Sequence, residues 1–567
     1  MTRPANPFGK DIANAALFRA LAQHGGFSDI AVLNRAGLTA EQLATEIGGS
    51  TAVRFATASI SDTALPARHG ALVRGQPYLS ELAWLRRSAG LDQAYSLVGL
   101  IHTIAPPAIR QMIGDAALAP THPWDALICT SPAVRQALQA MFEAWAEHLA
   151  ARIGAVRAPR PQLPMIPLAV DTELLTRQAA DRQARAALRQ RLAIDDNDVV
   201  VLWVGRLSYY EKAFPQCMFQ AVQQAARRCS RRLHFLLTGW FPGGESELRL
   251  YQQAASLLAP DLNVVVLDGN DPGLLAQSWA AADLFLSLVD NIQETFGLAP
   301  VEAMAAGLPV VVSDWDGYRY TVRDGVDGVL VPTLGSPGGA AGELLARLHS
   351  LELETYQTYV GAAAQHTAVH VQQAAVAIAR LADHPAQRRA MGNSGQQRAQ
   401  AMFSWPEVVR LHRELLAELA ERRRCADPAA ASAGARLQPL RGEPFASFQH
   451  FASQVLNPDL VLRVAEGVSA ADLEQHLLVQ LNRLYPGLRG NPTEARTLLT
   501  RLEAAGSTGL RVADLLAAEV PERRAWLETT LVWLAKLGLV DWYHAHDRSD
   551  LAGSLADPVL MQSEPLS

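Results

Sequence analysis

Glu294 lies just before a helix whose first turn the sequence predicts at Pro300, and Glu302 lies within that helix. Backbone N–H groups at a helix N-terminus attract phosphate, and carboxylates accept hydrogen bonds from sugar hydroxyls. Together they would suit a ligand with a diphosphate in its middle and a polyol at each end. A surface loop with two solvated glutamates explains the same residues equally well, because acids are common near helix starts.

The elements that would position these carboxylates follow from the neighbouring residues. Gly297 allows the backbone to approach a ligand closely, and Pro300 suits a first helical turn, where a missing N–H costs nothing. Gly307 ends the helix, and residues 308–312 then predict a buried parallel strand. The segment therefore predicts loop, helix, turn and strand in that order.

The pattern resembles the motif of family 4 retaining glycosyltransferases, whose fold is GT-B. Seven residues separate Glu294 from Glu302, and Glu-Ala-Met-Ala-Ala-Gly-Leu-Pro-Val-Val begins at Glu302. The resemblance implies that Glu294 holds the donor sugar and Glu302 the nucleotide ribose. It also implies that the backbone between them binds the diphosphate and the sugar, at Thr295, Phe296, Gly297 and Leu298.

A second motif, Gly205-Arg206-Leu, follows a predicted strand at residues 199–204, with Lys212 shortly after it. The resemblance assigns Gly205 to the donor site and gives Arg206 and Lys212 the task of neutralising the leaving diphosphate. Fixed cations stabilise the negative charge that develops as a nucleoside diphosphate departs. Two solvated basic residues on a loop are the alternative.

Two residues of the N-terminal region are further candidates. His102 ends an apolar stretch that predicts a strand, and ligands bind at the carboxyl ends of strands in open α/β sheets. By resemblance His102 faces the donor sugar, although a histidine satisfied within the core is the alternative. Gly9 stands where the family's glycine loop approaches donor phosphate or acceptor, but a flexible chain end explains it nearly as well.

Residues 313–320 depart from the family pattern. Asp316 replaces a glycine, and Tyr320 stands where an acid is frequent, which puts a donor contact there in doubt. Ser131 is expected to cap the helix that follows it. Trp405 is expected to pack against the core rather than to bind a ligand.

Composition narrows the class of protein. The net charge of -6 over 567 residues argues against nucleic-acid binding, which needs a basic surface. The 4 cysteines lie far apart, without disulfide or metal-ligand spacing, and predict reduced thiols in a cytoplasmic protein. No signal peptide and no transmembrane segment is evident, which leaves peripheral membrane contact open.

The expected fold class is α/β: GT-B, with two Rossmann-like domains facing a central cleft and a C-terminal, mostly helical domain that loosely resembles a winged helix. The parallel strands of the second Rossmann-like domain are predicted at residues 199–204, 233–238, 264–267, 284–288 and 310–313. The first domain's apolar runs are at residues 30–33, 53–58, 94–104, 126–129 and 165–170. The predicted parts are an acceptor domain (1–170), a nucleotide-sugar-binding domain with a crossover helix (171–421), a linker (422–440), an accessory domain (441–550) and a disordered tail (551–567).

The resemblance implies transfer of a sugar from a nucleotide-sugar, most often a UDP-sugar, to an acceptor hydroxyl with retention of configuration. Neither a cofactor nor a metal ion is expected, and the acceptor (glycan, lipid-linked glycan, small metabolite or protein) stays open. The alternatives are a phosphorylase or epimerase on the same fold, and a scaffold or regulatory protein built on a vestigial transferase. Residues 441–550 are expected to bind a protein partner or a second copy, and not DNA, because acids outnumber bases there.

Overall fold

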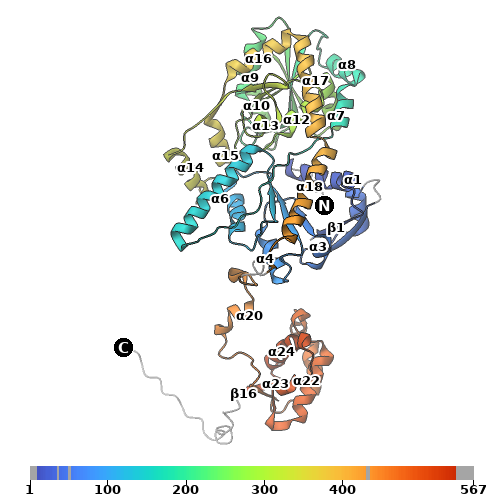
Figure 1. The fold of residues 1–567 in the computed structure, drawn as a ribbon, viewed down its shortest axis with the longest axis vertical. Helices are drawn as coiled ribbons and strands as arrows, with labels where there is room; N and C mark the ends of the chain where they lie inside the picture. The colour runs from blue at the N-terminus through green and yellow to red at the C-terminus, as the bar shows by residue number, and fades with distance from the viewer. Residues whose placement is uncertain (1–8, 35–36, 49–52, 429–433, 544–567) are drawn as a thin grey trace. The chain divides into compact units, whose positions relative to one another are not determined.

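The computed structural model describes residues 9–34, 37–48, 53–428 and 434–543. The chain divides into two compact units, Met1–Leu440 and Arg441–Ser567, each of which has its own hydrophobic core. The first unit contains two α/β halves (Figure 1).

The second α/β half, at the top of Figure 1, is built on a six-stranded parallel sheet with the order β11-β10-β9-β6-β7-β8. Its strands are β6 (Val199–Arg206), β7 (Leu233–Trp240), β8 (Asn263–Asp268), β9 (Leu284–Ser287), β10 (Val310–Ser313) and β11 (Gly328–Val331). The central strands are continuous apolar runs because helices cover both faces of a parallel sheet. Counted from β6 along the chain, the order is that of a Rossmann fold.

Helices surround this sheet (Figure 1). Among them, α9 packs against α16, and α11 packs against α7 and α8. They are α7 (Thr172–Ala179), α8 (Arg182–Arg191), α9 (Gln216–Ala226), α10 (Glu245–Leu258), α11 (Pro272–Ala281), α12 (Leu298–Ala305), α13 (Tyr318–Thr321), α16 (Val371–Asp383) and α17 (Pro385–Met402). The glycine-rich segment at residues 335–342 is partly regular. It lies among β12 (Thr333–Gly335), α14 (Ala340–Ser350), α15 (Tyr356–Gln365) and β13 (Thr367–Val369).

The first α/β half contains two small parallel sheets, β1-β2 and β3-β4-β5. The strands are β1 (Asp29–Asn34), β2 (Arg54–Ser59), β3 (Ala71–Arg74), β4 (Ser96–Leu100) and β5 (Ala126–Ile128). The helices are α1 (Gly9–His24), α2 (Ala40–Leu43), α3 (Ala64–His69), α4 (Ser80–Ser88), α5 (Pro107–Gly114) and α6 (Pro132–Ile153).

Two features of this half differ from the sequence prediction. β3 was not predicted, because four partly buried residues give too short a pattern. Residues 165–170 do not form a strand and make only isolated bridges, such as Cys129 with Met165. A strand before Gly9 would fall outside the described residues.

The first unit is closed by α18 (Trp405–Arg424), which returns from the second half to pack against α1 (Figure 1). Trp405 packs against the apolar cluster between these helices, as expected. Arg423 donates hydrogen bonds to the carbonyl of Gly70 and to Ser96 Oγ, each at 2.7 Å. The helix thus extends three residues beyond the predicted boundary at 421, because its last turn is bound to the first half.

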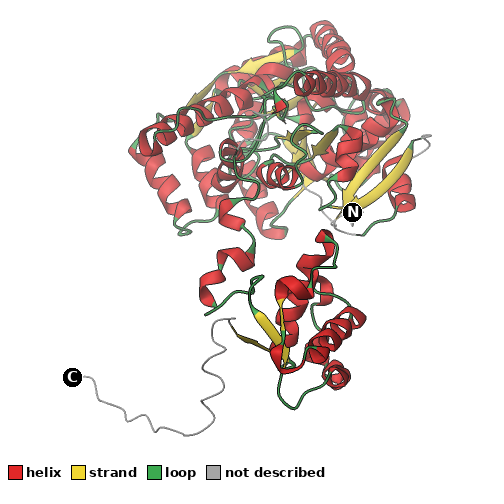
Figure 2. Ribbon diagram, turned by 60° about the horizontal axis from the view of Figure 1, so that its bottom comes forward, coloured by secondary structure: helices red, strands yellow, loops and turns green. Residues whose placement is uncertain are grey.

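The second unit combines helices with a three-stranded antiparallel sheet of order β15-β14-β16 (Figure 2). Its elements are α20 (Pro444–Ser447), β14 (Val461–Val464), α21 (Leu473–Leu478), α22 (Pro492–Ala504), β15 (Leu510–Arg511), α23 (Val512–Leu515), α24 (Pro521–Lys536) and β16 (Val540–Tyr543). The expected tail at 551–567 lies outside the described residues. None of the helices in the described ranges has the length and apolar character needed to cross a membrane.

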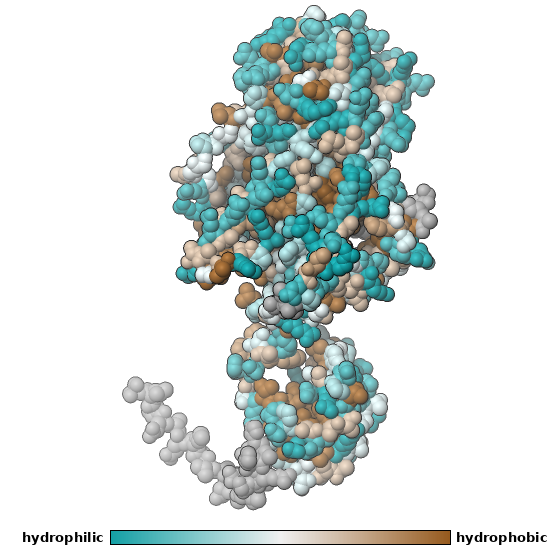
Figure 3. All heavy atoms as spheres, viewed as in Figure 1, coloured by the Kyte–Doolittle hydropathy of each residue, from teal (hydrophilic) through white to brown (hydrophobic). Residues whose placement is uncertain are grey.

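The surface of the second unit exposes many apolar side chains among polar ones (Figure 3). The most exposed include Phe445, Phe448, Phe451, Leu478, Leu481 and Tyr485. An exposed apolar surface of this kind is typical of regions that bind another molecule.

Candidate active site

The candidate site begins where the order of the six-stranded sheet reverses. The chain leaves β6 toward β7 on one side and β9 toward β10 on the other, although β6 and β9 are neighbours. Ligands of open α/β sheets bind in the crevice at such a switch point, beyond the carboxyl ends of the strands. The loops that carry Lys212 and Glu294 both emerge there.

An ion pair joins these two loops. Lys212 Nζ lies 3.1 Å from Glu294 Oε2, and Glu294 Oε1 accepts hydrogen bonds from the N–H groups of Thr295 (3.3 Å) and Gly297 (3.1 Å). Burial alone would raise the pKa of Glu294, but Lys212 and the backbone N–H groups hold it below its ordinary value. Glu294 is therefore a fixed, ionised carboxylate at the switch point.

Glu302 lies in α12, within the electrostatic influence of Lys212. Burial raises the pKa of Glu302 to about 7, and Lys212 offsets only part of this effect. Within the described parts of the chain, no side chain donates a hydrogen bond to the Glu302 carboxylate. It is thus an acceptor available to a ligand hydroxyl.

The start of α12 is shaped by Gly297, whose φ of 85° lies in the left-handed region. A Cβ at this position would overlap the ring of Tyr318, so glycine is required. Phe296 is buried and packs edge-to-face against Phe403, with ring centroids 5.9 Å apart. Its side chain belongs to the core, and Leu298 is the first residue of the helix.

Arg206 ends β6, and its Nη1 lies 2.5 Å from Glu211 Oε2. Gly205, just before it, has a φ of 147°, a conformation that L side chains rarely adopt. The structure therefore places Gly205 and Arg206 at the same end of the sheet as Lys212. The Arg206 charge is partly neutralised by Glu211, which the sequence analysis did not single out.

His102 follows β4 in the first half and has a polar environment of its own. Its Nε2 lies 2.9 Å from Asn14 Oδ1, while Asn14 Nδ2 donates to the carbonyl of Gly75 at 2.9 Å. Burial lowers the pKa of His102, so the ring is neutral at pH 7, with Nε2–H donating to Asn14. Gly9 begins α1, the helix that carries Asn14.

Backbone and hydroxyl groups connect the two halves at this point. Thr295 Oγ1 donates to the carbonyl of His102 at 2.7 Å, and Thr130 Oγ1 donates to the carbonyl of Thr295 at 3.2 Å. The loops after β4 and β5 thus contact the loop that carries Glu294. Of the predicted residues, the structure gathers Lys212, Glu294, Thr295, Gly297 and Glu302 most closely, with His102 on the facing side.

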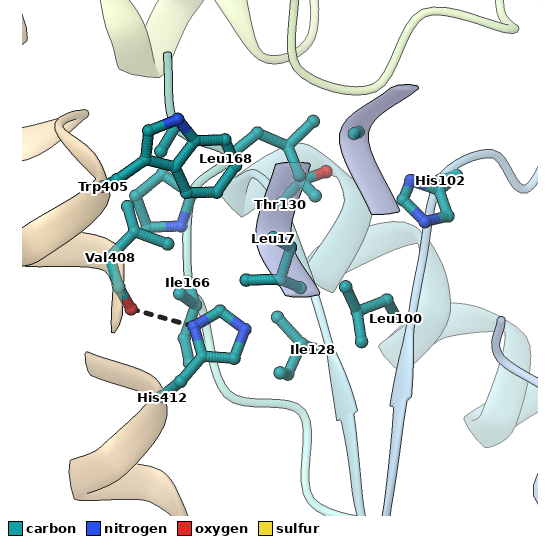
Figure 4. A pocket seen from close by; sticks show the side chains of 13 residues that line it. Leu17, Leu100, His102, Ile128, Thr130, Ile166, Leu168, Trp405, Val408 and His412 are labelled. Carbon is teal, nitrogen blue, oxygen red and sulfur yellow. Dashed lines mark hydrogen bonds between the residues drawn. The ribbon is translucent and has the colours of Figure 1, made fainter. Parts of the chain in front are cut away.

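A small cavity of about 20 Å³ lies behind His102 and Thr130, between β4, β5, α1 and α18 (Figure 4). It has space for about one water molecule. His412, 5% exposed, donates from Nδ1 to the carbonyl of Val408 at 2.8 Å, and its Nε2 has no partner among the described residues. The walls are mainly apolar, and of the described candidate residues they include His102 but none of the cations of the switch point.

Two carboxylates near the site had no role in the sequence analysis. Asp290 is buried, which raises its pKa to about 8, and it accepts from the N–H of Phe214 at 3.4 Å. Asp316 Oδ1 accepts from Ser131 Oγ at 3.0 Å, and Ser131 also caps α6 as expected. The only signal for Asp316 was its departure from the family's glycine. In the described ranges, no set of three His, Cys, Asp or Glu side chains could hold a metal ion.

Comparison with known proteins finds a family match and several relatives. The model of the family described as "Glycosyl transferases group 1" matches residues 184–366. A D-inositol 3-phosphate glycosyltransferase of Geodermatophilus obscurus is 36% identical over 152 residues, covering 26% of this chain and 33% of the relative. A protein of the same name from Xylanimonas cellulosilytica is 30% identical over 255 residues, covering 44% of this chain and 58% of the relative.

Among solved structures, HepE of Anabaena in complex with UDP is 18% identical, with a TM-score of 0.47, covering 73% of this chain and 98% of that one. Sucrose-phosphate synthase of Thermosynechococcus elongatus is 20% identical, with a TM-score of 0.44, covering 73% of this chain and 94% of that one. This chain spans between a third and three fifths of the length of the two curated relatives. The match to the family described as "Glycosyl transferases group 1" therefore covers the segment that contains β6, β9 and the loops of the switch point.

Proposed function

We propose that this protein transfers a sugar from a nucleotide-sugar to an acceptor hydroxyl with retention of anomeric configuration, and that the donor is a UDP-sugar. The observation that carries the proposal is the arrangement around Lys212, which pairs with Glu294 and acts electrostatically on Glu302. One cation between two carboxylates matches a ligand with a diphosphate between two polyols.

Each group has a chemical task in this proposal. Glu302 accepts hydrogen bonds from the ribose, and Glu294 orients the donor sugar. Lys212 and Arg206 stabilise the negative charge of the departing nucleoside diphosphate, together with the N–H groups at the start of α12. His102 lines the opposite side of the cleft as a neutral ring.

The proposed reaction is a front-face displacement. The bond between the anomeric carbon and the phosphate oxygen breaks, while the acceptor oxygen bonds to the same carbon from the same face. The acceptor proton passes to the departing phosphate oxygen, so no protein base is required. No cofactor or metal ion enters this scheme. The Lys212–Glu294 pair opens on donor binding, which frees the Lys212 ammonium for the diphosphate.

The test is turnover of UDP-, GDP- and ADP-sugars by the full-length chain, with NMR to identify the anomer of the product. We expect nucleotide diphosphate release from a UDP-sugar and a product with the donor's anomeric configuration. Glu302→Ala should lose this activity. A product of inverted configuration would exclude retention. Turnover that requires inorganic phosphate would favour a phosphorylase.

A further inference from the structure

Asp316 is a carboxylate in an unusual backbone conformation beside the candidate site. Its φ of 36° lies in the left-handed region, which is uncommon for a residue with a side chain and is often retained at functional sites. Its Oδ1 is hydrogen-bonded, but Oδ2 is buried and has no partner in the described part of the chain. A buried carboxylate oxygen without a donor is costly unless a ligand supplies one.

The loop that carries Asp316 packs directly on the loop that carries Glu294. Trp315 Nε1 donates to the carbonyl of Asn291 at 3.1 Å. A Cβ at Gly317 would overlap the backbone of Phe296, so the two loops touch at that point. The two carboxylates are close enough for the charge of Glu294 to act on Asp316.

The first half of the unit fixes the orientation of Asp316. Ser131 Oγ donates to Asp316 Oδ1 at 3.0 Å from the start of α6, which follows β5. This contact occupies one carboxylate oxygen and leaves the other without a partner among the described residues. Asp316 is thus held between the two halves, next to the carboxylate to which the proposed function assigns the donor sugar.

We propose that Asp316 is a specificity-determining residue that accepts a hydrogen bond from a hydroxyl of the donor sugar through Oδ2. This inference rests on the proposed function. With Glu294 beside it, the sugar pocket is lined by two carboxylates. The pocket therefore favours neutral hexoses, whose hydroxyls donate hydrogen bonds, over hexuronic acids, whose own carboxylate would be repelled.

The protonation of Asp316 should make the preference between donor sugars depend on pH. A purely structural role of this residue would not produce that dependence. Burial raises the pKa of Asp316 to about 7, opposed by the Ser131 hydroxyl and the Gly317 N–H and reinforced by the charge of Glu294. The carboxyl group is therefore neutral at pH 6 and ionised at pH 8. The enzyme's discrimination against uronic-acid donors should therefore increase from pH 6 to pH 8.

The experiment compares kcat/KM for UDP-glucose and UDP-glucuronic acid, and for UDP-galactose and UDP-galacturonic acid, at pH 6 and pH 8. The full-length chain is tested as wild type, Asp316→Asn, Asp316→Gly and Ser131→Ala. Asp316→Asn keeps the shape of the side chain. Asp316→Gly relieves the positive φ and should not lower the melting temperature.

We expect the preference for the neutral sugar to fall at least about 10-fold in both Asp316 variants, and its rise with pH to disappear. In Ser131→Ala the carboxylate remains, so the preference should fall less than in the Asp316 variants, and its rise should move to higher pH because the Ser131 hydroxyl lowers the pKa of Asp316. Unchanged ratios in both Asp316 variants of an active enzyme would overturn this inference alone. The same loss in Ser131→Ala as in Asp316→Asn would also overturn it, because the contact between the halves would then explain the effect. A wild-type protein that consumes no nucleotide-sugar would overturn the proposed function, and this inference with it.

Discussion

At the scale of single residues, the site depends on one ammonium group among carboxylates. Lys212 contacts Glu294 and acts on Glu302, so one positive charge lowers the pKa of both carboxylates. The net pKa shift is nevertheless downward for Glu294 and upward for Glu302. These three residues could be selected as candidates from the sequence, because they lie in short contiguous motifs. The pairs His102–Asn14 and Ser131–Asp316 could not, since they join segments 88 and 185 residues apart.

Replacement of Lys212 tests the charge of the leaving-group site. Lys212→Ala should lower kcat by about 10²–10³, the usual effect of removing one donor that stabilises developing negative charge. Steady-state kinetics with a UDP-sugar provides the measurement. The chain has only two other lysines, Lys10 and Lys536, and exposed Lys536 in the second unit provides the matched control as Lys536→Ala. Equal activity of the two variants would contradict the role of Lys212.

The ionisation of Glu302 predicts a pH-dependent stability. Its folded pKa of about 7 lies above the ordinary glutamate value of 4.5, so the folded state retains a proton that the unfolded state has released. Stability from this group is therefore lost as pH rises from about 4.5 to about 7. Glu302→Gln lacks this effect.

Melting temperatures of Glu302→Gln and wild type should therefore diverge between pH 5 and pH 8, in favour of the variant, by an amount on the order of a few degrees. Glu466→Gln, at an exposed glutamate of the second unit, is the control and should follow the wild type. A constant difference between Glu302→Gln and the wild type at all pH values would show that Glu302 titrates normally.

At the scale of elements, the site is made by loops at the carboxyl ends of β4, β5, β6, β9 and β10. Long apolar runs made most of the six-stranded sheet predictable from sequence. The short, half-buried β3 was not predictable, because four residues give no clear periodicity. Residues 165–170 are apolar but form a connection between the halves, since tertiary packing can bury an apolar run without a strand.

Gly297 tests the contact between two of these loops. Gly297→Ala forces a side chain into a φ of 85° and against the Tyr318 ring, and should destabilise the first unit by about 1–3 kcal/mol. Denaturant titration measures the loss, and UDP binding should weaken as well. Gly338→Ala is the control, because a Cβ there meets no neighbouring atom. Equal stability of the two variants would show that the loop adapts without cost.

At the scale of the whole molecule, two compact units have separate cores, and the group 1 match lies wholly in the first. We therefore propose that the second unit binds the acceptor or a protein partner, through its exposed apolar side chains. Its sequence predicted a mostly helical domain that loosely resembles a winged helix, but the positions of its three strands were not predicted. Its strands contain only two to four residues each.

Deletion of residues 441–567 tests this division. The remaining unit should keep its melting transition and its UDP affinity, and should hydrolyse the donor at a rate within about twofold of the full-length chain, because its core is independent. Transfer to the acceptor should fall if the second unit binds it. Equal loss of hydrolysis and transfer would contradict separate roles for the two units.

The central claim is that the switch point of the six-stranded sheet binds a nucleotide through Lys212, Glu294 and Glu302. Isothermal titration of UDP into the full-length chain, without added metal, tests it most directly, with Glu302→Ala and the exposed Glu466→Ala measured in parallel. We expect saturable binding by wild type and Glu466→Ala, and affinity at least about 10-fold weaker in Glu302→Ala, since a hydrogen bond to a charged group contributes about 1.5–3 kcal/mol. Equal UDP affinity in all three proteins would contradict the assignment of this site.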